Sequence, residues 1–148
     1  MIFFFLTFQV LNTKVIFSAR RTAYDADISW ANVEGDITFD LVEINIGGGF
    51  DGSVFTVPIN GVYKMTFTGQ SAKKQYTYNI VQLFKNGSFL YNVILDADEE
   101  SDLKNLSCTW MIRLVKGDVL KLHAINGLST EGSFRSHLVF TGELIYID

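Results

Sequence analysis

Apolar residues in this chain recur with a period of two, in short runs separated by glycine, asparagine and aspartate. That period is typical of a β-strand with one buried face, and no stretch sustains the 3.6-residue period of a helix. Thirteen phenylalanines and six tyrosines strengthen the pattern, because aromatic side chains favour strands. The sequence therefore predicts an all-β sandwich of about ten strands. The runs expected to form strands are 15–19, 37–41, 53–57, 62–68, 78–85, 89–95, 106–115, 119–125 and 137–147.

Short glycine-containing segments are expected to form the turns between these strands. Asn86-Gly87 separates two runs, and the pair suits the positive φ angles of a two-residue hairpin turn. Lys116-Gly117-Asp118 is a second tight connection, and the three glycines at 47–49 interrupt the chain earlier. The alternation also assigns residues to the core, namely Tyr63, Met65 and Phe67 from one strand and Leu106, Cys108, Trp110, Ile112 and Leu114 from another.

Residues 1–13 form an apolar segment that is too short to span a bilayer as a helix, so no membrane span is expected. We interpret the segment as a signal-peptide remnant, although no Lys or Arg precedes it and no Ala-x-Ala cleavage site follows. An extra edge strand is the alternative. Residues 14–148 are expected to form one globular domain, because 148 residues with 48% hydrophobic content can bury a core.

Charge and reactive side chains exclude several classes of function. The chain has 12 Lys and Arg against 16 Asp and Glu, and the basic residues are scattered, so nucleic acid is not an expected partner. Cys108 is the only cysteine and lacks a basic neighbour in sequence, which favours a buried apolar role over a reactive thiol. His123 and His137 lie in separate runs and form no His-x-His metal motif. We therefore expect that the chain is not an enzyme.

The segment FDLVEINIGGGFDGSVFTVPINGVYKMTF, which begins at Phe39, carries a spaced series of residues that resembles the signature of the C1q globular head domain. The matching residues are Phe39, Asn45, Phe50, Phe55, Gly61, Tyr63 and Phe67. Two departures are a shorter interval between Phe50 and Phe55 and Met65 in place of an aromatic residue. Segments similar to other parts of the family follow in the family's order: VIFSA at 15–19, KNG at 85–87, LVKGDVLKLH at 114–123 and FTGELIY at 140–146, with Glu143 in a place that is usually apolar.

The resemblance implies a jelly roll of the C1q and tumour-necrosis-factor-like (C1q/TNF-like) superfamily that assembles as a trimer, is usually secreted and recognises ligands through loops. The expected function is that of a secreted homotrimeric module for innate-immune-type or other extracellular recognition, with protein, carbohydrate or lipid ligands. One alternative is a TNF-like signalling ligand that clusters a receptor. Another is an intracellular trimeric assembly domain, which would apply if residues 1–13 are not a signal.

An acidic run, DADEESD at 96–102, is the candidate metal site. Hard carboxylate ligands clustered in a loop suit Ca²⁺. The run is not an EF-hand, because Ser101 and Ser107 stand where that motif has Gly and Glu. The resemblance implies calcium ligands near the trimer apex, whereas a solvated charged loop is the alternative. The candidate ligands are Asp96, Asp98 and Asp102, preferred for their short side chains, and Glu99 and Glu100.

Two Asn-x-Ser sequons are candidate glycosylation sites, Asn86-Gly87-Ser88 and Asn105-Leu106-Ser107. Both lie near predicted turns or strand ends, and their use depends on secretion. Because turn geometry already explains Asn86, Asn105 is the preferred candidate.

Overall fold

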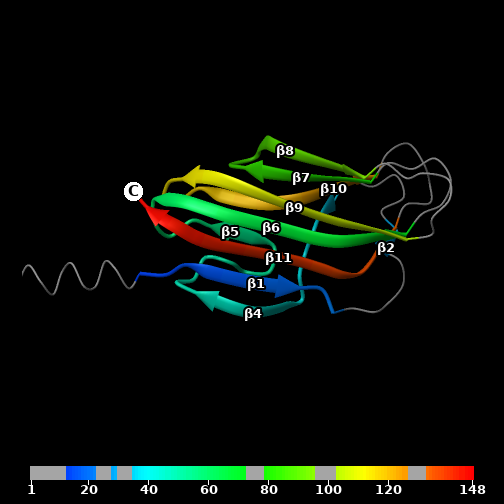
Figure 1. The fold of residues 1–148 in the computed structure, drawn as a ribbon, viewed down its shortest axis with the longest axis horizontal. Coiled ribbons are helices and arrows are strands. Elements are labelled where there is room, and N and C mark those ends of the chain that lie inside the picture. The colour runs from blue at the N-terminus through cyan, green and yellow to red at the C-terminus, as the bar shows by residue number, and fades with distance from the viewer. Residues whose placement is uncertain (1–12, 23–27, 30–34, 73–78, 96–102, 127–132) are drawn as a thin grey trace, which may run out of the picture.

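The computed structural model describes residues 13–22, 28–29, 35–72, 79–95, 103–126 and 133–148. These residues form two antiparallel β-sheets packed into a sandwich (Figure 1), which confirms the predicted all-β fold. The described residues contain eleven strands, of which two are only two residues long. The described part of the chain has no helix long and apolar enough to cross a membrane.

Strands that are distant in sequence lie next to each other in both sheets. The six-stranded sheet has the order β4 (Leu41–Ile46), β1 (Ile16–Arg20), β11 (Ser133–Ile147), β6 (Gly61–Ala72) and β9 (Leu103–Leu114), and β2 (Ile28–Ser29) pairs with β11. The five-stranded sheet has the order β3 (Gly35–Asp36), β10 (Val119–Asn126), β7 (Asn79–Lys85) and β8 (Ser88–Leu95), and β5 (Val54–Thr56) pairs with β10. In Figure 1, β1 and β4 lie along one long side of the molecule and β7 and β8 along the other. This strand order is that of a jelly roll.

The run 37–41 is not the strand that its alternation predicts. Ile37 and Phe39 are buried, but they lie between β3 of one sheet and β4 of the other. The backbone nitrogen of Ile37 donates to Leu122 O at 2.8 Å, and that of Phe39 donates to Gly52 O at 2.7 Å. The segment therefore crosses between the sheets. Most of β4 lies outside the predicted runs. It is an edge strand whose last four residues are exposed, so it has no buried face to produce an alternating pattern.

Aromatic rings fill the centre of the core between the sheets. Phe17 stacks on Phe50 with 4.5 Å between ring centroids and 10° between ring planes, and it meets Phe140 edge-on at 5.1 Å. Phe39 packs against Phe50 at 6.2 Å and against Phe140 at 5.9 Å. Each such pair contributes about 0.5–1.5 kcal/mol beyond the burial of its surface. The phenylalanines of the signature are therefore core residues.

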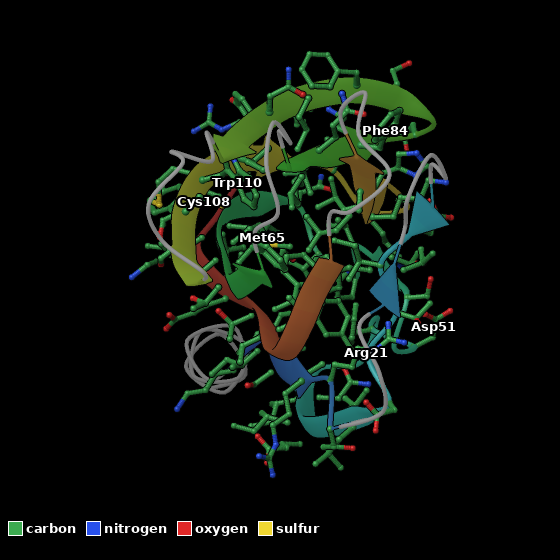
Figure 2. All side chains as sticks on the ribbon, turned by 90° about the vertical axis from the view of Figure 1, so that its right-hand side faces the viewer. Arg21, Asp51, Met65, Phe84, Cys108 and Trp110 are labelled. Carbon is green, nitrogen blue, oxygen red and sulfur yellow. The ribbon has the colours of Figure 1, made fainter. Side chains whose placement is uncertain are left out.

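The core faces predicted for β6 and β9 are confirmed in the described residues. The side chains buried as expected are Tyr63, Met65, Phe67, Trp110, Ile112 and Leu114, whereas Cys108 is half-buried. The side chain of Leu106 lies outside the described residues. Figure 2 shows Met65 in the interior and Cys108 and Trp110 on the β9 side. Met65 is 0% exposed, so it is a core residue at the position where the signature has an aromatic residue.

The side chain of Asn45 closes the glycine turn that follows β4. Gly47, Gly48 and Gly49 have φ angles of +79°, +73° and +105°, as a sharp change of direction requires. Asn45 donates from Nδ2 to Phe50 O at 3.0 Å, and its Oδ1 accepts from the Phe50 nitrogen at 3.5 Å. These contacts fix the direction in which Phe50 enters the core.

Candidate binding surface

The outer face of the six-stranded sheet has small hydroxyl side chains at its centre. Buried residues such as Phe17 and Phe67 alternate with outward-facing ones, so that Ser18, Thr141, Thr66 and Thr109 are successive cross-strand neighbours. The hydroxyls of Thr66 and Thr109 lie 3.2 Å apart. On the next row, those of Thr68 and Ser107 lie 3.4 Å apart. These hydroxyl pairs are uncharged and short, whereas the adjacent row carries two exposed charged residues, Glu143 on β11 opposite Lys64 on β6.

Large apolar side chains are exposed at the margins of the same sheet. Ile44 and Ile46 on β4 are 42% and 52% exposed, Met111 on β9 is 57% exposed, and Tyr146 near the end of β11 is 62% exposed. Single exposed apolar residues are common, whereas several on one face indicate a contact surface. None of these residues is predicted from the sequence to be functional. The signal was present in Trp110-Met111-Ile112, where three consecutive apolar residues break the alternation.

A second set of exposed aromatic residues lies at the edge of the sandwich formed by β8 and β9. Tyr91 is 40% exposed and stacks on Trp110 with 6.5 Å between ring centroids and 15° between ring planes. Phe89, also on β8, is 51% exposed and meets Phe84 edge-on at 6.4 Å. Rings with one packed face and one exposed face are common at protein contacts.

Cys108 lies on β9, close to this edge, and behaves as an apolar residue. Its Sγ donates to Phe67 O at 3.8 Å. Burial raises the pKa of the Cys108 thiol to about 11, so the thiol is protonated at neutral pH. The expected apolar role is supported, although the side chain is half-buried and not enclosed in the core.

His123 is engaged in a surface ion cluster on the five-stranded sheet. Its Nδ1 lies 2.9 Å from Asp36 Oδ1, and Lys121 Nζ lies 3.0 Å from Asp36 Oδ2. Burial alone would raise the pKa of Asp36, but the hydrogen bonds from His123 and Lys121 outweigh it and lower that pKa. The cluster holds β3 against β10.

The side chain of His137 lies outside the described residues. Within the described ranges, no three His, Cys, Asp or Glu side chains lie close enough together to form a metal site.

The acidic run of predicted calcium ligands lies outside the described residues, so the calcium site stays a prediction. These residues are Asp96, Asp98, Glu99, Glu100 and Asp102. The flanking strand ends, Leu95 of β8 and Leu103 of β9, pair with Asn79 and Ala72. This end of the sandwich is opposite the Asn86-Gly87 turn. Asn105 is the third residue of β9 and pairs with Gln70, and its side chain is not among those described.

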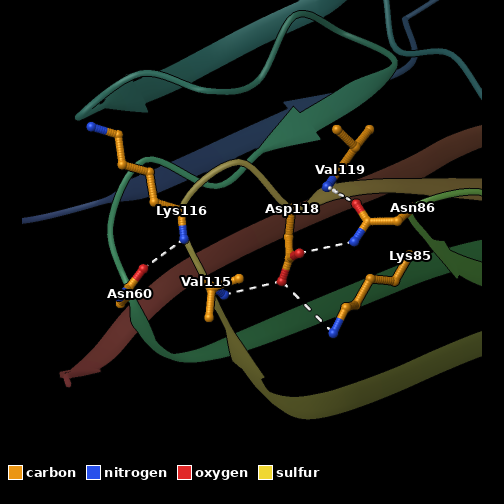
Figure 3. Close-up of polar contacts among 7 residues, drawn as sticks. All are labelled: Asn60, Lys85, Asn86, Val115, Lys116, Asp118 and Val119. Atoms are coloured by element: carbon orange, nitrogen blue, oxygen red, sulfur yellow. Dashed lines mark hydrogen bonds and ion pairs between the residues drawn. The ribbon is translucent and has the colours of Figure 1, made fainter.

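The Asn86-Gly87 turn is confirmed, and its asparagine also contacts the turn between β9 and β10 (Figure 3). Asn86 and Gly87 have φ angles of +51° and +77°. Asn86 Nδ2 donates to Asp118 Oδ1 at 2.9 Å, and Asn86 Oδ1 accepts from the Val119 nitrogen at 2.8 Å. Nδ2 is the atom that would carry a glycan. Glycosylation at Asn86 or Asn105 stays a prediction.

Asp118 is the buried charge that organises this end of the molecule. It is 6% exposed, and its Oδ2 accepts from the Val115 nitrogen at 3.0 Å and lies 3.7 Å from Lys85 Nζ. Burial would raise the pKa of Asp118, but the hydrogen bonds from Val115 and Asn86 and the charge of Lys85 lower it. The sequence predicted a turn here but not a buried carboxylate joining two turns.

Comparison with known proteins identifies the fold. The globular domain of zebrafish complement 1qA protein superposes with a TM-score of 0.71 at 22% sequence identity, covering 92% of this chain and all of that one. Murine APRIL in a crystal structure at pH 5.0 superposes with a TM-score of 0.66 at 10% identity, covering 90% of this chain and all of that one. At these identities the likeness concerns the fold, and it confirms the C1q/TNF-like jelly roll.

The family is established by sequence. The C1q domain matches residues 16–145, which extend from the first residue of β1 into β11 and include every residue of the signature. This chain therefore belongs to the C1q-domain family.

Proposed function

We propose that this chain is the recognition domain of a secreted homotrimer that binds an extracellular protein, carbohydrate or lipid and has no catalytic activity. The observation that carries the proposal is the set of exposed apolar side chains on the six-stranded sheet of a C1q domain. An interface that covers Met111, Ile46 and Tyr146 removes this surface from water. Closed cyclic assembly is the usual way in which identical chains bury such surface.

In the proposed ring, each chain offers the outer face of its six-stranded sheet to one neighbour and its β8–β9 edge to the other. The short hydroxyl side chains around Thr66 and Thr109 allow close approach of a neighbouring chain. The charged residues in the adjacent row, Glu143 and Lys64, are cross-strand neighbours of opposite sign, so neither would be buried without an opposite charge beside it. Other charged residues lie nearer the borders, where Arg20 pairs with Glu43 at 3.0 Å and Arg113 pairs with Asp148 at 3.4 Å. Tyr91, which stacks on the buried Trp110, and Phe89 supply the matching apolar surface on the edge.

We further propose that calcium assists recognition and is held by carboxylates of the run 96–102. The support is the donor chemistry, because five carboxylates within seven residues repel one another until a hard divalent cation neutralises them. The run connects two strands at the end of the sandwich that is opposite the Asn86 turn. A ligand held there would be presented away from that turn.

A second candidate function is that of a signalling ligand on the TNF-like side of the superfamily, which clusters a receptor in the grooves between subunits. The likeness to murine APRIL favours this alternative. Cell-surface capture of a receptor by the intact trimer would support it, whereas binding to isolated glycans or lipid vesicles without any receptor would support the recognition module.

The experiment that tests the assembly is the mass of the full chain in solution by light scattering, for the wild type and for Met111→Lys. We expect the mass of three chains for the wild type and a lower mass for M111K, because a lysine at that position would be buried without a partner. Thr56→Lys adds the same charge at an exposed position of β5, which lies on the opposite side of the five-stranded sheet from β8, and should leave the trimer intact. A monomeric wild type at micromolar concentration contradicts the proposal.

A further inference from the structure

The exposed turn between β7 and β8 contains a chemically labile dipeptide. Asn86 is followed by Gly87, and a side chain at position 87 would meet nothing within 4 Å. Both residues are exposed. Because glycine lacks a Cβ, its backbone nitrogen can reach the side-chain carbonyl carbon of the preceding asparagine with little steric hindrance. We propose that Asn86 is a site of spontaneous deamidation whose rate is controlled by Asp118.

The reaction is an intramolecular acyl transfer followed by hydrolysis. The Gly87 nitrogen loses its proton to water and attacks Cγ of Asn86, Nδ2 leaves as ammonia, and a five-membered succinimide remains. Water then opens either carbonyl of the ring and gives aspartate or isoaspartate. The net change consumes one water and releases one ammonia, and it needs no other reactant.

A second Asn-Gly pair in the described residues provides an internal comparison. Asn60 precedes Gly61, the first residue of β6, and a Cβ at Gly61 would lie 2.1 Å from Tyr146 O. The backbone of Gly61 is therefore enclosed by the neighbouring strand and cannot move towards the Asn60 side chain. The Gly87 backbone has no such neighbour, so Asn86 should react before Asn60.

The reactive geometry at Asn86 is opposed by a clamp from the β9–β10 turn. The Asn86 amide donates to Asp118 and accepts from the Val119 nitrogen, and the Asn86 backbone nitrogen donates to Val119 O at 2.8 Å. Asp118 is itself held by the Val115 nitrogen and by Lys85 (Figure 3). For Cγ to approach the Gly87 nitrogen, both side-chain hydrogen bonds of Asn86 must break. The opening of the clamp therefore limits the rate.

Deamidation is expected to open the clamp permanently. The product carries a carboxylate where Nδ2 now lies 2.9 Å from Asp118 Oδ1, so a donor is replaced by a second negative charge. Isoaspartate also adds a carbon to the backbone of the turn. The β7–β8 hairpin then loses its connection to the β9–β10 turn, and this end of the sandwich loosens with the age of the molecule.

The experiment is a time course in which the full chain, produced without glycosylation, is kept in mildly alkaline buffer made with ¹⁸O water and then mapped by peptide mass spectrometry. We expect ¹⁸O incorporation at Asn86 before Asn60. Asp118→Ala should accelerate the reaction at Asn86 about tenfold or more, as expected for loss of a hydrogen bond to a charged acceptor. Asp51→Ala removes a carboxylate that accepts from the Ser53 and Val54 nitrogens in another turn, and it should leave the Asn86 rate unchanged.

A second variant separates the clamp from general unfolding. Asn86→Asp copies the product, and its melting temperature should fall relative to wild type at neutral pH and recover in acid, where the two carboxyls can share a proton. Three results would overturn the proposal: Asn60 reacting before Asn86, equal acceleration in D118A and D51A, or an N86D variant whose melting temperature equals that of the wild type at neutral pH.

Discussion

The ring of Phe17 occupies the place where a side chain at position 142 would begin. The two residues are cross-strand partners in β1 and β11, and a Cβ at Gly142 would lie 2.2 Å from Phe17 Cε1. Because Phe17 also stacks on Phe50, its ring has no free space into which it can move. A glycine on one strand therefore makes room for the aromatic core contributed by the other.

Replacing Gly142 with alanine should destabilise the fold, although alanine is otherwise compatible with a strand. The added methyl group must displace Phe17, and overpacking of this kind typically costs about 1–3 kcal/mol. Urea unfolding would measure the loss. Thr56→Ala, at an exposed position of β5 outside the proposed interface, should change stability by only a few tenths of a kcal/mol, roughly as surface substitutions do. Equal stabilities for G142A and T56A would contradict the prediction.

Asp118 should make the free energy of unfolding depend on pH in the acid range. Because its hydrogen bonds and Lys85 hold the pKa of Asp118 below its ordinary value of 3.8, the carboxylate stabilises the fold at pH values above that value. This contribution is lost as the pH falls through the lowered pKa. Asp118→Asn should lower the unfolding free energy at pH 7 by about 1–3 kcal/mol and weaken the acid dependence.

Denaturant unfolding from neutral to strongly acid pH would test the role of Asp118. Glu43→Gln is the matched control, because it removes a carboxylate from the exposed pair with Arg20 and should have little effect. If D118N and E43Q give the same profile, Asp118 does not supply the acid sensitivity.

The Cys108 thiol should react slowly in the native protein. A pKa of about 11, against 9.0 for an ordinary cysteine thiol, reduces the thiolate fraction about a hundredfold at neutral pH. Reaction with a coloured disulfide reagent should therefore be much slower in buffer than in denaturant, and it should accelerate as the pH approaches 11. A native thiol that reacts as fast as the unfolded one would show that Cys108 is not held against Phe67.

Calcium should raise the melting temperature if the carboxylates of the run 96–102 bind it. A ligand at 100 times its dissociation constant stabilises the native state by about 2.7 kcal/mol. The shift should disappear with chelator and in the triple variant Asp96→Asn, Asp98→Asn, Asp102→Asn, and magnesium should give less because it favours a smaller octahedral site. An unchanged melting temperature with calcium and with chelator would reject the site.

Turns and strand faces could be predicted from the sequence where local geometry alone determines them. Asn86-Gly87 adopts the positive φ angles that its composition favours, and Tyr63 and Phe67 face the core as their alternation indicates. The run 37–41 shows where this reasoning fails. Ile37 and Phe39 alternate as in a strand, but they are buried because the chain passes between the two sheets there, and alternation cannot distinguish these two cases.

The fold class, the family and the spacing of the aromatic core could be predicted from the amino-acid sequence, because they follow from the periodicity and spacing of residues along the chain. The contacts between distant segments could not. In the folded chain Asp118 accepts a hydrogen bond from Asn86, Phe17 lies against Gly142, and Met111 and Tyr146 are exposed on the same sheet. Such contacts depend on strand pairing and sheet order, which join residues far apart in sequence and leave no local periodic signal.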